Sequence, residues 1–506
     1  MGNYDIRVNI EIVETNDPVN NEPVKTKDGS FKLNISESEA ISIDKCEKKL
    51  LWTNYEAIRD AVSKHLTEVS KKKAKDQEIE GELITNDHVY QVDGEVGRFT
   101  FKTYSVKRDG SITYNTAKSV FPELTGEEWY KTSGFKEIGM IYGTTENSYR
   151  KAADLINRIR YQEGATPSRS LLENTETEGA KIIDFIEQKT TEILEKNHFT
   201  EEGMPKDKSE ESEESMKEVV LLSEEEVNRA IEACRLSDEE QKEVERNPVC
   251  YEDPEQTVNI SIDDVGVKKQ KEERGTEDKG KKETRKREYV HNTVAHIQKE
   301  KKSYTVNGYS TVSVLRVIIG FLLNNDLLKC RLQFFVDGQR TLQAAILKVF
   351  SWFGNIGIIL DWYHLEDKCK KQLSLAMKGR QIRNDVLNGL VRILWYGMID
   401  KAIKYLSDLD ESLIKDKDAL LTLIGYIERN RPYIPCYAVR KELRLRNSSN
   451  IGEKMNDLVV SDRQKHNGMS WSKDGSVALA SLTVIKRNKE YKKWLEEGDL
   501  EFKWAA

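Results

Sequence analysis

The stretch from residue 257 to residue 361 alternates between β-strand and helix patterns in an order that strongly limits the fold. It predicts three strands, a helix at 311–324, a fourth strand, a second helix and a fifth strand. Strands are indicated by alternating or continuous apolar residues, and helices by apolar residues three or four apart. The first, fourth and fifth strands each end on an aspartate, namely Asp263, Asp337 and Asp361. We therefore expect a mixed α/β domain with carboxylates at its strand ends.

This order is the layout of an RNase H-like domain, whose active site lies at the ends of the first and fourth strands. A third acid should come from a later helix, and Glu453 is the candidate because we expect it away from the buried side of its helix. The side expected to be buried comprises Ile451, Met455, Leu458 and Val459, and the other side Glu453, Asn456, Val460 and Arg463. An alternative stays open, since Asn450-x-x-Glu453 also fits a capping box at a helix start.

Three converging carboxylates suit metal-dependent phosphoryl transfer. The attacking and leaving oxygens of a phosphodiester both gain negative charge, and two divalent cations about 4 Å apart stabilise them. Mg²⁺ prefers oxygen ligands and binds through a few carboxylates plus the substrate phosphate. We therefore predict two Mg²⁺ ions, which Mn²⁺ can replace, at the catalytic residues Asp263, Asp337 and Glu453. The alternative for the two aspartates is a turn at the end of each strand.

Three nearby residues are expected to have accessory roles. Asp264 is the alternative to Asp263 as the first ligand, because the two are adjacent at the strand end. Asp361 and His364 are expected to orient a ligand or the scissile phosphate rather than to bind the metal themselves. For His364, a hydrogen-bonded histidine at a strand-to-helix junction is the alternative.

Charge and composition divide the rest of the second half. The formal net charge of −7 argues mildly against a nucleic-acid partner, but the two signs are segregated along the chain. Residues 201–256 are rich in Glu, Ser and Lys, and predict an acidic linker with one or two exposed helices. Helical spacing predicts an all-helical insertion at 367–440, between the first part of the core at 257–366 and its end at 441–506.

The sequence argues against a zinc finger and against a membrane span. Its six cysteines include no CxxC pair. The best apolar run, at 312–323, is interrupted by polar residues and is too short to cross a bilayer. Scattered cysteines suit a reducing compartment, so we expect a cytoplasmic protein with no membrane partner.

The first half predicts two smaller regions. Residues 1–120 form an expected α+β module, with a strand at 6–12, helical spacing at 50–69 and a hairpin turn at Asp109-Gly110. Residues 121–200 form an expected helical region with the outline of a helix-turn-helix, in which Ser148 caps one helix and Thr166-Pro167 restarts the next. An ordinary two-helix corner is the alternative. The side chains expected to face outward and contact DNA are Ser168, Arg169 and Asn174.

Four motifs resemble those of bacterial DDE insertion-sequence transposases related to the Mutator superfamily. They are Ser261-Ile262-Asp263-Asp264-Val265-Gly266-Val267, Phe335-Val336-Asp337-Gly338, Leu360-Asp361-Trp362-Tyr363-His364-Leu365, and the stretch from Asn450-Ile451-Gly452-Glu453 to Gly468-Met469-Ser470-Trp471. They resemble the family's two aspartate motifs, its aspartate-x-x-histidine motif, and its glutamate helix with a Gly-Met-x-Trp turn. The resemblance covers residues 258–482, with a weaker match at 99–179.

The resemblance implies a transposase that cuts an insertion sequence at its terminal inverted repeats and joins it to target DNA. It implies double-stranded DNA as the partner, a homo-oligomer on that DNA, and a place at the bacterial nucleoid. Arg463 and Lys465 are expected to bind phosphate, with a solvated face as the alternative. The alternative functions are an RNase H-like nuclease or resolvase without strand transfer, and a domesticated, inactive DNA-binding protein.

Overall fold

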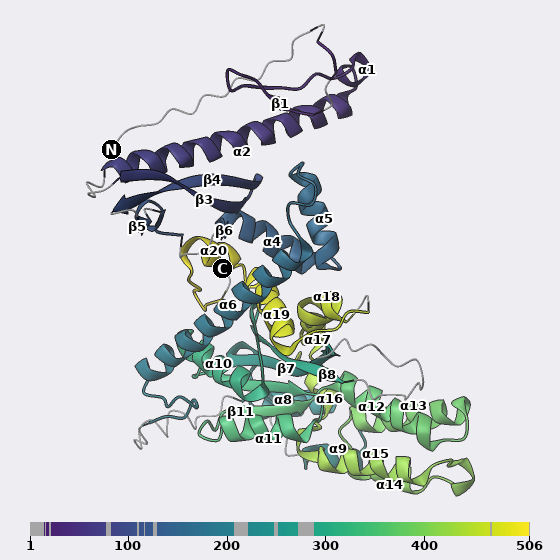
Figure 1. Ribbon diagram of the computed structural model, residues 1–506. Coiled ribbons are helices and arrows are strands. Elements are labelled where there is room, and N and C mark those ends of the chain that lie inside the picture. Colours follow the sequence, from purple (N-terminus) through teal and green to yellow (C-terminus); the bar gives the residue numbers. More distant parts are fainter. Residues whose placement is uncertain are drawn as a thin grey trace, which may run out of the picture. The chain divides into compact units, whose positions relative to one another are not determined.

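The computed structural model describes most of the chain, in two compact units that are treated separately below (Figure 1). The described residues are 15, 17–19, 22–76, 82–108, 111–115, 117–124, 129–206, 221–246, 251–271, 288–465 and 468–504. The first unit is Met1–Leu172 and the second is Glu173–Ala506. The division therefore falls within helix α6 (Ser168–Lys196).

The first unit contains a four-stranded sheet in the order β5-β4-β3-β6. The strands are β3 (Glu82–Gly94), β4 (Gly97–Arg108), β5 (Ser111–Asn115) and β6 (Trp129–Lys131). Helix α2 (Ile43–Asp76) lies along β4 in Figure 1, and its Leu66 and Val69 pack on Tyr90, Phe101 and Phe121. The shorter elements are β1 (Val24–Lys25), β2 (Phe31–Lys32), α1 (Glu37–Ala40) and α3 (Ala117–Val120).

Two predictions for this unit are confirmed, and one cannot be compared. The helical spacing at 50–69 belongs to α2, and β4 pairs with β5 on either side of the expected hairpin turn, with Arg108 opposite Ser111. The turn residues Asp109 and Gly110 themselves lie outside the described residues, as does the strand expected at 6–12.

The helices expected around Ser148 and Thr166 are present. Ser148 caps α5 (Tyr149–Ile159) by accepting a hydrogen bond from the backbone N–H of Lys151, and α4 (Ser133–Thr145) precedes it. Thr166 does not directly precede α6, which begins at Ser168, and the Thr166 hydroxyl accepts a hydrogen bond from the Arg160 guanidinium at 2.9 Å. Ser168 and Arg169 are exposed as expected. The outward position expected for Asn174 is wrong.

Asn174 is buried, with 3% of its surface exposed. It lies three residues after the fully buried Leu171, and residues three apart share one face of a helix. Asn174 therefore belongs to the packed side of α6.

The second unit contains a five-stranded sheet in the order β11-β10-β7-β8-β9. Strand β10 is parallel to its neighbours β7 and β11, whereas β7, β8 and β9 are antiparallel. The predicted succession of elements is confirmed. In chain order it is β7 (Thr257–Lys268), β8 (Tyr289–Lys299), β9 (Lys302–Gly308), α10 (Thr311–Asn324), β10 (Arg331–Val336), α11 (Arg340–Val349) and β11 (Ile356–Leu360). A 3-10 turn, Pro254–Gln256, leads into β7.

The main core of this unit lies between the sheet and the apolar helices α10 and α11. Ile260 and Ile262 of β7 are buried there with Ile318 of α10 and Ile346 of α11. One predicted boundary is wrong, since β7 does not end at Asp263-Asp264. It runs on to Lys268 because β8 continues to pair with it, as far as Tyr289.

The region after β11 is helical, as predicted. It comprises α12 (Trp362–Ala376), α13 (Arg380–Trp395), α14 (Ile399–Ser407), α15 (Lys417–Arg429) and α16 (Tyr437–Glu442), with 3-10 turns at Glu411–Leu413 and Arg431–Tyr433. Leu365, Leu390 and Leu423, from three of these helices, share a second core. We call α12 to α16 the helical region.

The segment predicted to be an exposed acidic linker instead packs against the helical region. Helices α8 (Glu224–Ala233) and α9 (Asp238–Glu245) contribute Ala230, Ile231 and Val244 to a cluster with Met398 and Val439. The reason is that Val227, Ala230 and Ile231 follow helical spacing and make an apolar stripe. The described part of this segment also supplies Glu252, which forms a buried ion pair with Arg440.

The C-terminal part of the second unit is helical. It comprises α17 (Asn450–Asn456), a π-helical turn Asp457–Ser461, α18 (Asp462–Gln464), α19 (Lys473–Arg487) and α20 (Tyr491–Glu497). Helix α19 packs on β8 and β9, and Asn488 after it bonds both the N–H and the C=O of Thr305. Within the described residues, no helix has the length and apolar character that crossing a membrane requires.

Candidate active site

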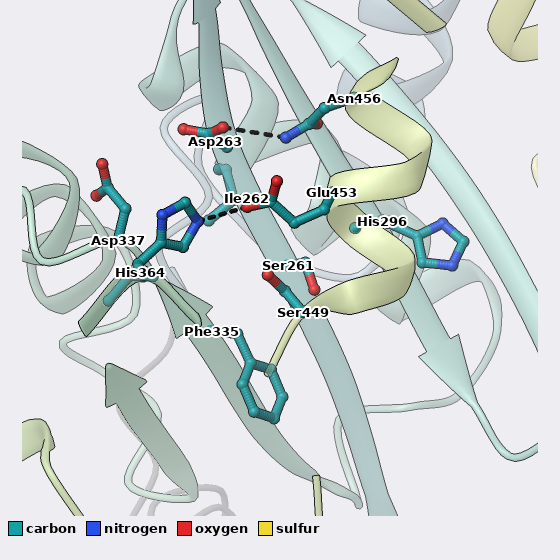
Figure 2. Close-up of a pocket in the computed structure, with 12 residues that line it drawn as sticks. Ser261, Ile262, Asp263, His296, Phe335, Asp337, His364, Ser449, Glu453 and Asn456 are labelled. Carbon is teal, nitrogen blue, oxygen red and sulfur yellow. Dashed lines mark hydrogen bonds and ion pairs between the residues drawn. The ribbon is translucent and has the colours of Figure 1, made fainter. Parts of the chain in front are cut away.

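A pocket lies in the second unit where β7 and β10 meet α17, and it collects the predicted acids (Figure 2). Its empty volume is about 310 Å³. Asp263, Asp337 and Glu453 all line it, together with His364. The other lining residues are Ser261, Ile262, His296, Phe335, Val336, Ser449, Gly452 and Asn456.

Asp263 faces this pocket because side chains alternate along β7. Ile260 and Ile262 point into the main core, so Ser261 and Asp263 lie on the opposite face, beneath α17. The carboxylate of Asp263 accepts hydrogen bonds from the Asn456 amide at 3.0 Å and from the backbone N–H of Asp264 at 2.8 Å. Burial and the nearby negative charge of Asp337 raise the pKa of Asp263.

Asp264 does not line the pocket. It points to the other face of β7, and its carboxylate accepts a hydrogen bond from the hydroxyl of Thr293, which lies opposite it on β8. Of the two adjacent aspartates that were candidates for the first ligand, the structure therefore places Asp263 in the pocket.

Asp337 combines its expected site position with a structural role. It follows β10 directly, and its carboxylate accepts from the backbone N–H of Gln339 at 2.9 Å, which makes a turn. Gly338 has a φ of +84°, and a Cβ there would come within 2.5 Å of the Tyr426 hydroxyl, so the turn needs glycine. Asp337 is therefore both a turn residue, as the alternative proposed, and a residue that lines the pocket.

Glu453 is not a helix cap. The N-cap of α17 is Ser449, and Asn450 already belongs to the helix. One carboxylate oxygen of Glu453 lies 2.6 Å from Nε2 of His364, on α12. The hydrogen bond from His364 lowers the pKa of Glu453. The capping-box alternative is therefore wrong.

The predicted faces of the Glu453 helix are wrong in part, although Val459 is buried as predicted. Ile451 is exposed, whereas Val460 and Arg463 are buried. Gly452 packs so closely on β7 that a Cβ there would lie 2.5 Å from Cβ of Ser261. The π-helical turn then rotates the residues after it relative to a regular helix. Glu453 itself is half-buried at the edge of the pocket.

His364 places a cation among the acids. Figure 2 shows its imidazole between Asp337 and Glu453. Burial by itself lowers the pKa of His364, but the hydrogen bond with Glu453 and the charges of Asp361 and Glu453 outweigh burial and raise it to about 9. With this pKa, His364 is protonated at neutral pH. It is also hydrogen-bonded at the junction of β11 and α12, which agrees with the alternative of a hydrogen-bonded junction histidine.

Asp361 is fully buried and does not line the pocket. It caps α12 by accepting from the backbone N–H groups of Tyr363 at 2.8 Å and His364 at 3.3 Å. Its second oxygen accepts from the backbone N–H and the hydroxyl of Ser449. Both oxygens are thus engaged, which fits the accessory role predicted for Asp361.

Metal binding would need some rearrangement. In the described part of the chain, no group of three or more His, Cys, Asp or Glu side chains is arranged so that it could hold a metal ion. Glu453 is turned toward His364, while Asp263 is held by Asn456. The donor set itself fits Mg²⁺, since three carboxylates line one pocket.

The residues predicted to contact DNA are divided between the two units. Ser168 and Arg169 belong to the first unit. Lys465 is exposed, but Arg463 is buried with its guanidinium 5.4 Å from the ring centre of Trp471. Arg463 therefore lies on the buried face of the helix, and not on the solvated face that was the alternative. Trp471 is buried.

Sequence reasoning missed three polar residues of the pocket, Asn456, Ser449 and His296. Asn456 lies one helical turn after Glu453, and this spacing was the only signal that could have linked the two. Ser449 acts through Asp361, which lies 88 residues earlier, so no local pattern reveals the bond. His296 bonds Thr305, which lies opposite it on β9, and nothing in the sequence singled this pair out.

No family model, curated protein or solved structure matches this chain. The pocket's residues and their contacts are therefore the basis for assigning a function.

Proposed function

We propose that the second unit is an RNase H-like domain that cuts and joins DNA as a DDE transposase. The observation that carries the proposal is the meeting of Asp263, Asp337 and Glu453 in one pocket. These acids come from the first strand, the fourth strand and a late helix of the unit. That is the arrangement that the four motifs led us to expect.

The sheet order supports the same proposal. An RNase H-like sheet places its first strand at the centre, next to the fourth, with the second and third strands on the other side. The order β11-β10-β7-β8-β9 follows this plan. Because β7 and β10 are parallel neighbours, they carry Asp263 and Asp337 to one region of the sheet.

In this proposal, Asp263, Asp337 and Glu453 would hold Mg²⁺, which supplies stabilisation of the charge that develops on the attacking and leaving oxygens. Asn456 and the backbone N–H of Asp264 fix the plane of the Asp263 carboxylate. His364 keeps Glu453 ionised and offsets the repulsion among the acids before DNA binds.

The reaction then has two steps at this one pocket. Water attacks a phosphodiester at the end of the element and frees a 3′-hydroxyl. That hydroxyl attacks target DNA in a transesterification, so no covalent protein–DNA intermediate forms. The proposed partner is double-stranded DNA, bound by a homo-oligomer of this chain at the nucleoid of the bacterial cytoplasm.

Incubation of the full chain and Mg²⁺ with linear DNA that carries the terminal inverted repeats flanking its gene, plus a circular target, tests the proposal. A transposase joins the linear DNA to the target. A product that is cut but never joined would instead identify a nuclease or resolvase. Binding without cleavage, in Mg²⁺ and in Mn²⁺, would identify an inactive DNA-binding protein and overturn the proposal.

A further inference from the structure

Hydrogen bonds join the start of α12 to the start of α17, although about ninety residues separate the two helices in the sequence. One oxygen of Asp361 caps α12, and its other oxygen accepts from the backbone N–H of Ser449 and from the Ser449 hydroxyl at 2.6 Å. A parallel bond runs from the backbone N–H of Trp362 to the carbonyl of Asn447 at 3.0 Å. A single buried carboxylate therefore holds two helix starts together.

These two helix starts carry His364 and Glu453, which line the pocket together with Asp263 and Asp337. His364 lies three residues after Asp361, and Glu453 lies four residues after Ser449, so each is one turn away from the bonded residue. His364 and Glu453 meet at 2.6 Å. The hydrogen bonds of Asp361 fix the start of α17 relative to the start of α12. They therefore also fix the position of Glu453 over β7.

The seat of α17 on β7 leaves little room for adjustment. Gly452 is the closest point, because even a Cβ on it would lie 2.5 Å from Ser261 Cβ and 2.9 Å from Ser261 Oγ. A helix that packs this closely cannot slide without losing the contact. The bonds from Asp361 to Ser449 act at the turn immediately before this contact.

We infer that Asp361, acting through Ser449, is the residue that positions Glu453 for metal binding. The inference rests on the proposed function, in which Glu453 is a ligand. Asp361 is a positioning residue, since both of its oxygens are engaged by the protein. It differs from Asp416, whose carboxylate accepts from the N–H of Ala419 inside its own helix α15.

Two substitutions separate this role from plain capping. Ser449→Ala removes only the hydroxyl bond, and Ser449→Thr keeps a hydroxyl and should restore function. Asp361→Asn is nearly isosteric and can still cap α12, but its amide nitrogen cannot accept the bonds of Ser449. Asp416→Asn is the matched control, because it changes a cap in the same unit without touching α17.

The measurement is Mn²⁺ binding to the full chain, followed by electron paramagnetic resonance, beside a thermal melt. We expect Ser449→Ala and Asp361→Asn to weaken Mn²⁺ binding by about 10–100-fold, the usual effect of losing a residue that orients a metal ligand. Ser449→Thr and Asp416→Asn should bind like the parent.

A double variant identifies the route of the effect. In the Glu453→Gln background, Ser449→Ala should cause no further loss, because the bond acts through Glu453. A further loss of the same size, or parent-like binding by both single variants, would overturn the inference while leaving the proposed function in place. If the parent and Glu453→Gln bind Mn²⁺ equally weakly, it is the proposed function that fails.

Discussion

The pocket has two sides that are held in different ways. The strand side consists of Asp263 on β7 and Asp337 directly after β10. The sheet fixes these two strands, because β7 pairs with β10 on one side and with β8 on the other. The helix side consists of Glu453 and Asn456 on α17 and His364 on α12, which are held by side-chain bonds such as those from Asp361 to Ser449. The strand side is set by the sheet, and the helix side can be displaced by a single substitution.

The largest expected effect is on the strand side. Asp337→Asn keeps the shape of the turn but removes the negative charge at the proposed Mg²⁺ site. It should reduce Mg²⁺-dependent cleavage by more than about 100-fold, the upper range for residues that only orient a ligand. DNA binding should persist, as measured by a gel-shift assay. Asp326→Asn, an exposed aspartate paired with Lys329, is the control. Cleavage by Asp337→Asn at the parent's rate would show that Asp337 is not part of the active site.

The next largest effect is a loss of stability from a substitution that displaces only the helix side. Gly452→Ala places a methyl group against Ser261 and should destabilise the fold by about 1–3 kcal/mol, as overpacked contacts do. Adding Ser261→Gly should recover much of this loss in a denaturant titration. Gly425→Ala, in a helix position with open space around it, should be neutral or stabilising by about 0.5–1 kcal/mol. Equal melting of Gly452→Ala and the parent would contradict the close seat of α17.

A smaller effect tests the bond between the two sides. Asn456→Ala removes the donor to Asp263 and should slow cleavage about tenfold, since it frees the carboxylate without removing it. Asn450→Ala, on the exposed start of the same helix, controls for changes in helix stability. The two variants are compared in single-turnover cleavage, and equal rates would show that Asp263 does not need Asn456.

The smallest expected effect is a pH dependence of folding stability, caused by His296 on β8. Burial lowers the pKa of His296 on β8 to about 4, whereas the pKa of an unperturbed histidine is 6.5. Between these values the unfolded chain binds more protons than the folded one, so stability should fall as the pH drops from 6.5 to 4. Melting curves of His296→Gln should show a weaker fall than the parent. His291→Gln, which changes an exposed histidine of the same strand, should leave the slope unchanged.

The strand side could be predicted from the sequence, because its signals are local. Alternation placed Ile260 and Ile262 in the core, and the end of the apolar run Phe334-Phe335-Val336 marked Asp337. The helix side could not be predicted in the same way. The partner of Glu453 is His364, on a helix about ninety residues earlier, and no local pattern links the two.

Helical periodicity also failed at particular residues for physical reasons. The π-helical turn shifts the register after Asn456, so Arg463 falls on the buried face that a regular helix would have reserved for other residues. Asn174 was assigned to the outside because it is polar, yet its position relative to Leu171 puts it inside. Residues 224–245 were judged by their charge, although their few apolar residues form a stripe that packs.

The buried ion pair of Glu252 and Arg440 limits where the chain can be truncated. Arg440 donates to both carboxylate oxygens of Glu252, and both side chains are almost completely buried. A fragment that begins at β7 would leave the Arg440 charge buried without its partner, at a cost of about 3–5 kcal/mol. Glu252 and the helical region therefore stabilise each other, and a fragment without Glu252 is expected to be less stable.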